Sequence, residues 1–304
     1  MDVAVVIRLP APPMLQRELG DWSDGFDVDG HAGSLHVPSL TGGSELAPPT
    51  GMPAAVAAVH DWGQRASAGT GDPSDDVMAV GALGVRLKDV PDDDVDGFIG
   101  RVKSHCWGWA RRLLAWIEVA HDQDLHLSEA VPWAEELYRD VVVMHSTGAA
   151  WQEGRPQGWR LTVMGWDPLD QRSWEIAVGR ATRGEEPPLG RRLLREGRHS
   201  FLMGRLREAT LHLGSALEMA LFPEVQRVKA ASGEKPLSNE ATLGTLVNEA
   251  TRLGIALPPP LQHSKSGFVP RRNGAVHDAV APPRDDVQGD LHAITGVVTS
   301  LVPL

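Results

Sequence analysis

RGEEPPLGRR, residues 183–192, is the stretch that divides this chain into two parts of different composition. Residues 1–189 have 15 Lys and Arg against 29 Asp and Glu, a balance of −14, whereas residues 190–304 have 14 against 11, a balance of +3. All ten tryptophans lie in the first part. Because Pro- and Gly-containing segments often mark domain boundaries, we predict one domain over residues 1–187 and another over residues 188–304.

Before this boundary, the patterns predict a sheet with one long helix. A short helix is expected at residues 53–66 and the long one within residues 91–125, where an acidic first turn suits the helix dipole. The first domain is therefore predicted to be mixed and β-rich, with the long helix packed on a mostly antiparallel sheet. Runs rich in β-branched, aliphatic and aromatic residues, which are typical of strands, occur at residues 2–9, 32–37, 78–87, 138–147, 158–166 and 174–179.

After the boundary, the strand signals stop and the apolar residues follow helical spacing. Helices are predicted at residues 200–230, 238–253, 270–281 and 285–301, separated by Gly and Pro breaks. Four helices joined by short loops form a compact bundle. The fold class is therefore predicted to be α+β, in which an N-terminal β-rich domain is followed by a C-terminal all-α bundle.

Composition excludes several classes of protein. No run approaches the ~20 apolar residues that a membrane-spanning helix needs, and no basic segment precedes the first apolar run, as a secretory signal would require. The single cysteine, Cys106, can form neither an internal disulfide nor a thiolate metal cluster, so we expect a cytoplasmic protein. The net charge of −11 disfavours nucleic-acid binding by the chain as a whole. This argument does not apply to the second domain, because its charge balance is positive.

The sequence FVPRRNGAVHDAVAPP, residues 268–283, holds the best candidate for a functional site. On a helix, Asn273 and His277 lie one turn apart on the same face, and Arg272 flanks them. This set suits cleavage of RNA, because a histidine can take the proton of an attacking 2′-hydroxyl and an arginine can hold the phosphate through two hydrogen bonds. No cluster of metal ligands accompanies the motif, so no metal or other cofactor is expected. The alternative is a solvated basic turn, since short motifs often match by chance.

The surrounding sequence resembles the HEPN family, whose all-α bundles include many metal-independent ribonucleases. The resemblance covers residues from about 200 to 304, where PRRNGAVH matches the family's motif of an arginine, four to six residues and a histidine. Order and spacing also agree for three further pieces, REATLHLGSALEMAL, TLGTLVNEATRLGIALP and AITGVVTSLVPL.

The resemblance implies a role for each residue of the motif. Arg272 would bind the phosphate, Asn273 would orient the reacting groups and His277 would be catalytic. Two supporting candidates are Arg271, an extra cation outside the motif, and Glu218, which lies on the first HEPN-like helix where such domains often carry a polar residue that can pair with an arginine. Family members also pair two motifs across a homodimer, so that one groove holds two arginines and two histidines.

We therefore expect a metal-independent endoribonuclease that acts on RNA as a homodimer. Its acidic N-terminal domain would restrain or direct it, as the target of a regulatory ligand or protein, an arrangement that resembles bacterial toxins and antiphage defence proteins. Two alternatives stay open. One is a catalytically silent HEPN module that binds RNA, a nucleotide or a partner protein, and the other is a scaffold-like dimer with a merely solvated motif.

Other patterns have a simpler explanation than a functional site. His105 and Cys106 suggest a metal or thiol site, but their place on the long helix favours packing. The acidic run Asp92–Asp94 with Asp96 lacks the spacing of a calcium-binding EF-hand loop, and GTGDPSDD at residues 69–76 lacks the lysine of a phosphate-binding loop. Four regularly spaced tryptophans could form an aromatic recognition surface, although core packing is the commoner role: Trp151, Trp159, Trp166 and Trp174.

Overall fold

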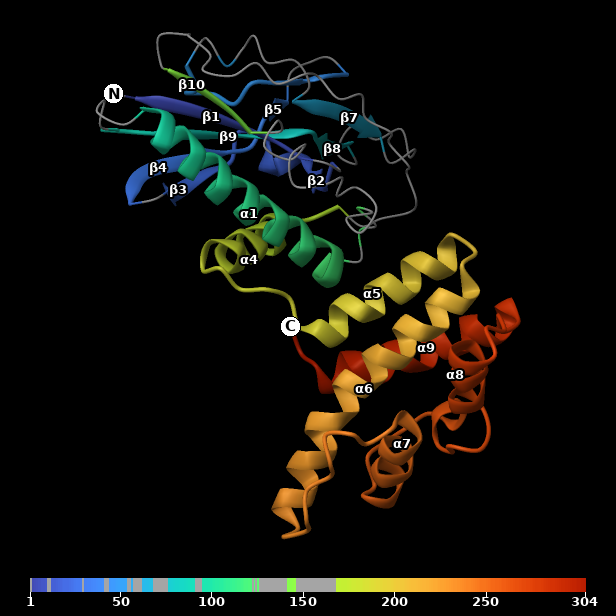
Figure 1. Ribbon diagram of the computed structural model, residues 1–304. Coiled ribbons are helices and arrows are strands. Elements are labelled where there is room, and N and C mark those ends of the chain that lie inside the picture. The colour runs from blue at the N-terminus through green and yellow to red at the C-terminus, as the bar shows by residue number, and fades with distance from the viewer. Residues whose placement is uncertain are drawn as a thin grey trace. The chain divides into compact units, whose positions relative to one another are not determined.

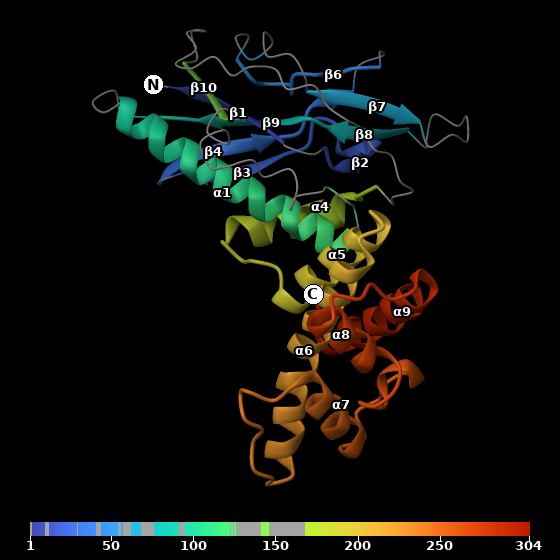
Figure 2. The same ribbon diagram turned by 45° about the vertical axis from the view of Figure 1, so that its right-hand side comes forward.

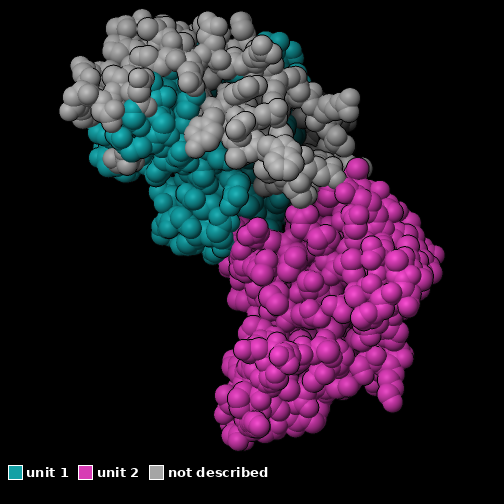
Figure 3. Space-filling model, in the orientation of Figure 1, with its two compact units in different colours: residues 1–186 teal, residues 187–304 magenta. Residues whose placement is uncertain are grey.

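The computed structural model forms two compact units, Met1–Glu186 and Pro187–Leu304, each with its own hydrophobic core (Figure 3). This division falls next to the boundary expected from composition. The first unit contains the strands and the second is helical, so the fold class is α+β as predicted. The structure describes residues 2–9, 12–28, 30–40, 44–53, 56, 62–67, 76–90, 95–121, 123, 125, 141–145 and 168–304.

The first unit is built around a five-stranded antiparallel sheet in the order β10-β1-β9-β4-β3 (Figure 1). Its strands are β1 (Val3–Arg8), β3 (Ser23–Val28), β4 (His31–His36), β9 (Ala82–Leu87) and β10 (Val141–His145). A three-stranded sheet consists of β2 (Met14–Gln16), β8 (Asp76–Val80) and β7 (Gly63–Ser67), and β5 (Ser39–Leu40) pairs with β6 (Leu46–Ala47). A 3-10 turn, η1 (Arg17–Leu19), follows β2.

The strands predicted at residues 2–9, 32–37, 78–87 and 138–147 are therefore present where the structure describes them. The run at 78–87 contains the end of β8 and all of β9, which lie in different sheets. The strand predicted at residues 158–166 lies outside the described residues.

The long helix α1 (Val95–His121) packs on one face of the five-stranded sheet (Figures 1 and 2). Phe98, Val102, Trp109 and Leu113 are buried, at the four- and seven-residue spacing that identifies a helix from sequence. The ring of Trp109 meets that of Phe26 on β3 edge to face, with centroids 4.9 Å apart. These contacts hold the helix and sheet together in one core.

Two predictions in the first unit are wrong. The strand predicted at residues 174–179 lies within α4 (Gln171–Thr182), where Asp170 caps the helix by accepting a hydrogen bond of 2.7 Å from the Ser173 amide. Alternating apolar residues suggested a strand, but Ile176 is 49% exposed and the buried side chains follow helical spacing. The helix predicted at residues 53–66 fails at its end, where β7 runs from Gly63 to Ser67, and most of its remaining residues lie outside those described.

The second unit contains five α-helices: α5 (Leu189–Leu202), α6 (Leu206–Ala231), α7 (Leu243–Arg252), α8 (Phe268–His277) and α9 (Arg284–Leu301). A 3-10 turn, η5 (Pro259–Leu261), precedes α8. The central helix is α6, which packs against the other four (Figure 1).

The helix predicted at residues 200–230 corresponds to α6, which begins only at Leu206, whereas residues 200–202 end α5, a fifth helix that was not predicted. The chain turns at Gly204, whose φ of +74° favours glycine, between α5 and α6. The apolar residues 201–203, directly before the turn, concealed the break. In the part of the chain that the structure describes, no helix combines the length and apolar character needed to cross a membrane.

Candidate functional site

The helix α8 carries the arginine, asparagine and histidine of the motif. Phe268, Val269 and Ala275 are buried and attach α8 to the core of the second unit. The residue before the helix, Gly267, has φ +73°, and a Cβ there would lie 2.3 Å from the Pro260 carbonyl oxygen. Only glycine allows this approach, so the turn from η5 fixes where α8 begins.

Arg272 points from α8 onto α6. Its stem lies over Gly214, where a Cβ would come within 3.0 Å of Arg272 Cγ and 3.3 Å of its Nε. Its Nη2 donates to Glu218 Oε1 at 3.2 Å, and the two side chains are 23% and 24% exposed. This is the pairing considered for Glu218 from the sequence. Arg272 Nε is buried without a hydrogen-bond partner in the described part of the chain, and Nη1 bonds to no described residue.

Two residues of α6 that take part in this arrangement were missed from the sequence. Gly214 leaves space for the arginine stem, and Arg207 donates from Nε to the Ala275 carbonyl oxygen at 2.8 Å. That carbonyl lies in the last turn of α8, where intrahelical partners are lacking. Arg207, Gly214 and Glu218 are spaced by seven and four residues, so they share one face of α6. This spacing is visible in the sequence, but it indicates a site only once α8 is known to pack on that face of α6.

Arg271 has a structural partner on α9. Its Nε and Nη2 donate to the two carboxylate oxygens of Asp290 at 2.9 and 2.5 Å. Asp290 is only 2% exposed, and this burial raises its pKa above the ordinary value although Arg271 opposes the shift. In return, the hydrogen bonds to Asp290 raise the pKa of Arg271. Arg271 therefore joins α8 to α9, and its charge is neutralised.

Asn273 and His277 are exposed on the outer side of α8. His277 is the last residue of the helix, one turn after Asn273, and neither side chain bonds to any residue that the structure describes. Two apolar side chains next to them also face solvent, Val276 at 38% and Val280 at 57% exposure. The imidazole is thus available to a ligand or to a second protein surface.

Where the structure describes them, the other sequence candidates give no competing site. Cys106 is fully buried, and burial raises the pKa of its thiol to about 12, so it is unreactive at neutral pH. The His105 ring lies edge-on to Phe26, with centroids 6.1 Å apart. Trp174 is buried against Trp22. Outside the described residues lie Asp92–Asp94, residues 69–75, Trp151, Trp159 and Trp166; nothing is described of the Asp96 side chain.

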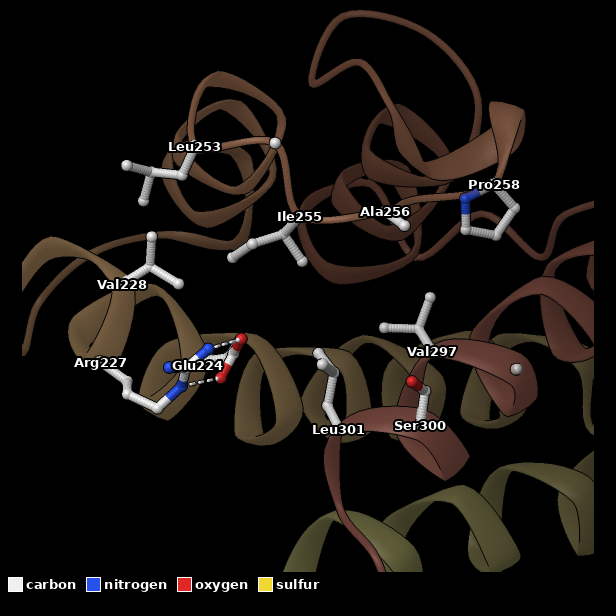
Figure 4. A pocket seen from close by; sticks show the side chains of 12 residues that line it. Glu224, Arg227, Val228, Leu253, Ile255, Ala256, Pro258, Val297, Ser300 and Leu301 are labelled. Carbon is white, nitrogen blue, oxygen red and sulfur yellow. Dashed lines mark hydrogen bonds and ion pairs between the residues drawn. The ribbon is translucent and has the colours of Figure 1, made fainter. Parts of the chain in front are cut away.

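A separate hollow of about 580 Å³ lies between α6, α9 and the segment after α7 (Figure 4). Its walls are largely apolar, with Val228, Ile255 and Val297 among them, and it contains no residue of the motif. The volume would suit a small molecule. Its one cation, Arg227, is already held by Glu224 at 2.6 Å, so no unpaired charge converges on the hollow. The motif on α8 is the stronger candidate.

Neither a metal centre nor a known relative explains the site. No three His, Cys, Asp or Glu side chains gather closely enough to hold a metal ion among the described residues. Models of known protein families, characterised proteins and solved structures contain no match for this chain. The chemistry of the site is therefore argued from its own geometry.

Proposed function

We propose that the second unit is a metal-independent endoribonuclease of the HEPN type. The observation that carries the proposal is the arrangement on α8, where Arg272 is held by Gly214 and Glu218 while His277 is exposed and without a partner among the described side chains. A guanidinium that a neighbouring helix holds in place can bind a phosphate, and an exposed imidazole five residues further along the same helix can move a proton.

In the proposed reaction, His277 takes the proton of a ribose 2′-hydroxyl as its oxygen forms a bond to phosphorus. The bond from phosphorus to the 5′-oxygen breaks, and that oxygen leaves with a proton, so the products are a 2′,3′-cyclic phosphate and a 5′-hydroxyl. Arg272 stabilises the negative charge on the phosphoryl oxygens through its unbonded Nη1. Asn273 orients the phosphate or the imidazole.

One motif supplies one histidine, whereas the reaction needs both a proton acceptor and a proton donor. We therefore propose that two chains pair their α8 helices and that the second histidine protonates the leaving oxygen. The exposed Val276 and Val280 support this, because apolar side chains next to a polar site are suited to a protein interface. The acidic first unit is proposed to restrain or direct the nuclease in answer to a regulatory ligand or protein, as in a toxin or antiphage defence system.

The test is cleavage of RNA by the purified full-length chain with a chelator present. His277→Ala and Arg272→Ala should each abolish cleavage, and the products of the wild-type chain should carry 2′,3′-cyclic phosphates. His263→Ala is the matched control for the histidine, because His263 is exposed and lies outside the motif. Arg227→Ala is the control for the arginine, because Arg227 is also paired with a glutamate of α6. Both controls should cleave as the wild type does.

A second candidate function is a catalytically silent HEPN module that binds RNA, a nucleotide or a protein. The neutralisation of Arg271 by Asp290 and of Arg272 by Glu218 favours it, because neither arginine then carries an uncompensated charge. The test is to incubate the wild-type chain with RNA between about pH 5 and 8, the range in which histidine changes its charge. Binding of RNA without cleavage throughout this range would establish the silent module and reject the nuclease.

A further inference from the structure

A serine and a histidine are hydrogen-bonded on the five-stranded sheet of the first unit. Ser34 Oγ and His36 Nε2 are 2.7 Å apart, and both side chains are partly buried. They are two residues apart on β4, so both point to the same face of the sheet. Leu35 between them is fully buried on the other face. That other face carries α1, because Phe26 on the neighbouring strand contacts Trp109.

Partial burial, together with the charge of Arg86, favours the neutral form of His36. Its pKa lies below the ordinary value of 6.5, mainly because the ring is partly buried and next because of the positive charge of Arg86 on β9. Asp21, which follows η1, opposes the shift. Arg86 is itself bound to Asp2 through Nη2 at 2.9 Å. At neutral pH the imidazole is therefore uncharged, and its Nε2 can accept the proton of the Ser34 hydroxyl.

Arg86 lies directly across the ladder from Ser34. Its Nη1 reaches the Gly51 carbonyl oxygen at 3.4 Å, but its Nε is buried and lacks a partner among the described residues. A guanidinium at this place can stabilise negative charge that develops next to the serine oxygen. Ser34 also lines a hollow of about 350 Å³, which leaves room for a small substrate. His31, Lys88 and Asp89 line the same hollow, whereas His36 and Arg86 are not among its lining residues and reach it through Ser34.

We propose that Ser34 is a nucleophile, activated by His36, that cleaves a small carboxylic ester bound in this hollow. Ser34 Oγ forms a bond to the ester carbonyl carbon while its proton passes to His36 Nε2, and Arg86 stabilises the carbonyl oxygen as it becomes negative. The bond from the carbonyl carbon to the alcohol oxygen then breaks, and the alcohol leaves with the proton from His36. Water, deprotonated by the same histidine, releases the acid and restores Ser34. This activity is independent of the nuclease proposed for the second unit.

The experiment treats the full-length chain with a fluorophosphonate, which forms a bond from a nucleophilic serine oxygen to phosphorus and releases fluoride. Mass spectrometry should locate one adduct, on Ser34, and Ser34→Ala should remove it. His36→Gln should slow the labelling by about 100-fold or more, the usual contribution of a general base. The matched control is Ser44→Ala, because Ser44 is an exposed serine of the same unit whose side chain bonds to no described residue. It should be labelled as the wild type is.

The pH dependence separates a nucleophile from a merely structural hydrogen bond without any variant. Labelling of the wild-type chain should be constant near neutral pH and should fall as the pH drops through the lowered pKa of His36, as the ring gains its proton. Tryptophan fluorescence, which reports on the first unit alone, checks that each variant is folded. An unlabelled Ser34 in the folded chain, or a labelling rate that neither pH nor His36→Gln changes, would overturn the proposal.

Discussion

Replacement of Gly214 by alanine tests whether α6 holds the side chain of Arg272 in place. The new Cβ would lie 3.0 Å from Arg272 Cγ and 3.3 Å from its Nε, inside the ~3.5–4.0 Å at which carbon atoms normally make contact. The stem of the arginine has to move by about half an ångström to restore that spacing. Its hydrogen bond of 3.2 Å to Glu218 is then stretched or lost.

Two effects on the free energy of unfolding oppose each other at this position. Alanine in place of glycine stabilises the interior of a helix by about 0.5–1 kcal/mol, whereas overpacking costs about 1–3 kcal/mol. We expect the effect of Gly214→Ala on the free energy of unfolding to lie between no change and a loss of about 2.5 kcal/mol. Gly289→Ala is the matched control, because a Cβ at Gly289 in α9 meets nothing within 4 Å. Gly289→Ala should therefore stabilise the second unit by the full gain of about 0.5–1 kcal/mol that alanine brings to a helix interior.

The measurement is urea unfolding of the full-length chain followed by far-UV circular dichroism. Tryptophan fluorescence is an internal control, since all ten tryptophans precede the second unit and their transition should not move. In an Arg272→Ala background the clash disappears, so Gly214→Ala should stabilise as Gly289→Ala does. The two substitutions should thus be coupled by about 1 kcal/mol or more. If Gly214→Ala stabilises the wild-type chain as much as Gly289→Ala does, the close approach of Arg272 to α6 is refuted.

Three further changes have expected outcomes. Arg271→Ala should cost the second unit about 3–5 kcal/mol, measured by the same unfolding, because it leaves the buried carboxylate of Asp290 unpaired; the loss should shrink at acidic pH as that carboxyl gains a proton. Arg252 and then Lys229 lower the pKa of Glu234 from 4.5 to about 2, so its stabilisation is complete above about pH 4.5 and is lost as the pH falls through about 2. The circular-dichroism midpoint should show this fall, and Glu234→Gln should reduce it. Cys106, buried with a thiol pKa of about 12, should react with a thiol reagent at neutral pH only after the first unit unfolds, as mass spectrometry would show.

Local sequence patterns correctly predicted those strands and helices whose formation depends mainly on their own residues. The valine-rich start of the chain forms β1, and the regularly spaced apolar residues from Phe98 onward lie in α1. Local patterns failed where the same spacing of apolar residues is compatible with both a strand and a helix. Trp174, Ile176 and Val178 alternate as in a strand, yet the cap from Asp170 and the burial of Ala177 and Ala181 make the segment helical. The turn at Gly204 was missed because an isolated glycine within a helical pattern does not by itself end a helix.

Arg271 and Arg272 could be singled out from the sequence, but their different partners could not. Adjacent residues on a helix point about 100° apart, and here that difference sends Arg271 to Asp290 on α9 and Arg272 to Glu218 on α6. Neither partner can be predicted from the residues around the two arginines, because Asp290 and Glu218 lie on other helices. The same holds for Gly214, which is an ordinary helical glycine until α8 packs against it.

The proposed chemistry places a strict condition on the exposed side of α8. A single chain offers His277 as one proton-transferring group, and both Arg272 and its neighbour Arg271 are already paired with carboxylates. A phosphate can displace Glu218 from Arg272 only if the new charge-assisted hydrogen bonds outweigh the old one, and a site closed off from water strengthens such bonds. Packing of Val276 and Val280 against a second copy would supply both that exclusion of water and the second histidine. Substitution of either valine by aspartate should therefore prevent association and RNA cleavage together, while unfolding of the isolated chain stays nearly unchanged because both side chains face solvent. A variant that remains monomeric at assay concentrations yet cleaves RNA at the wild-type rate would show that one motif suffices.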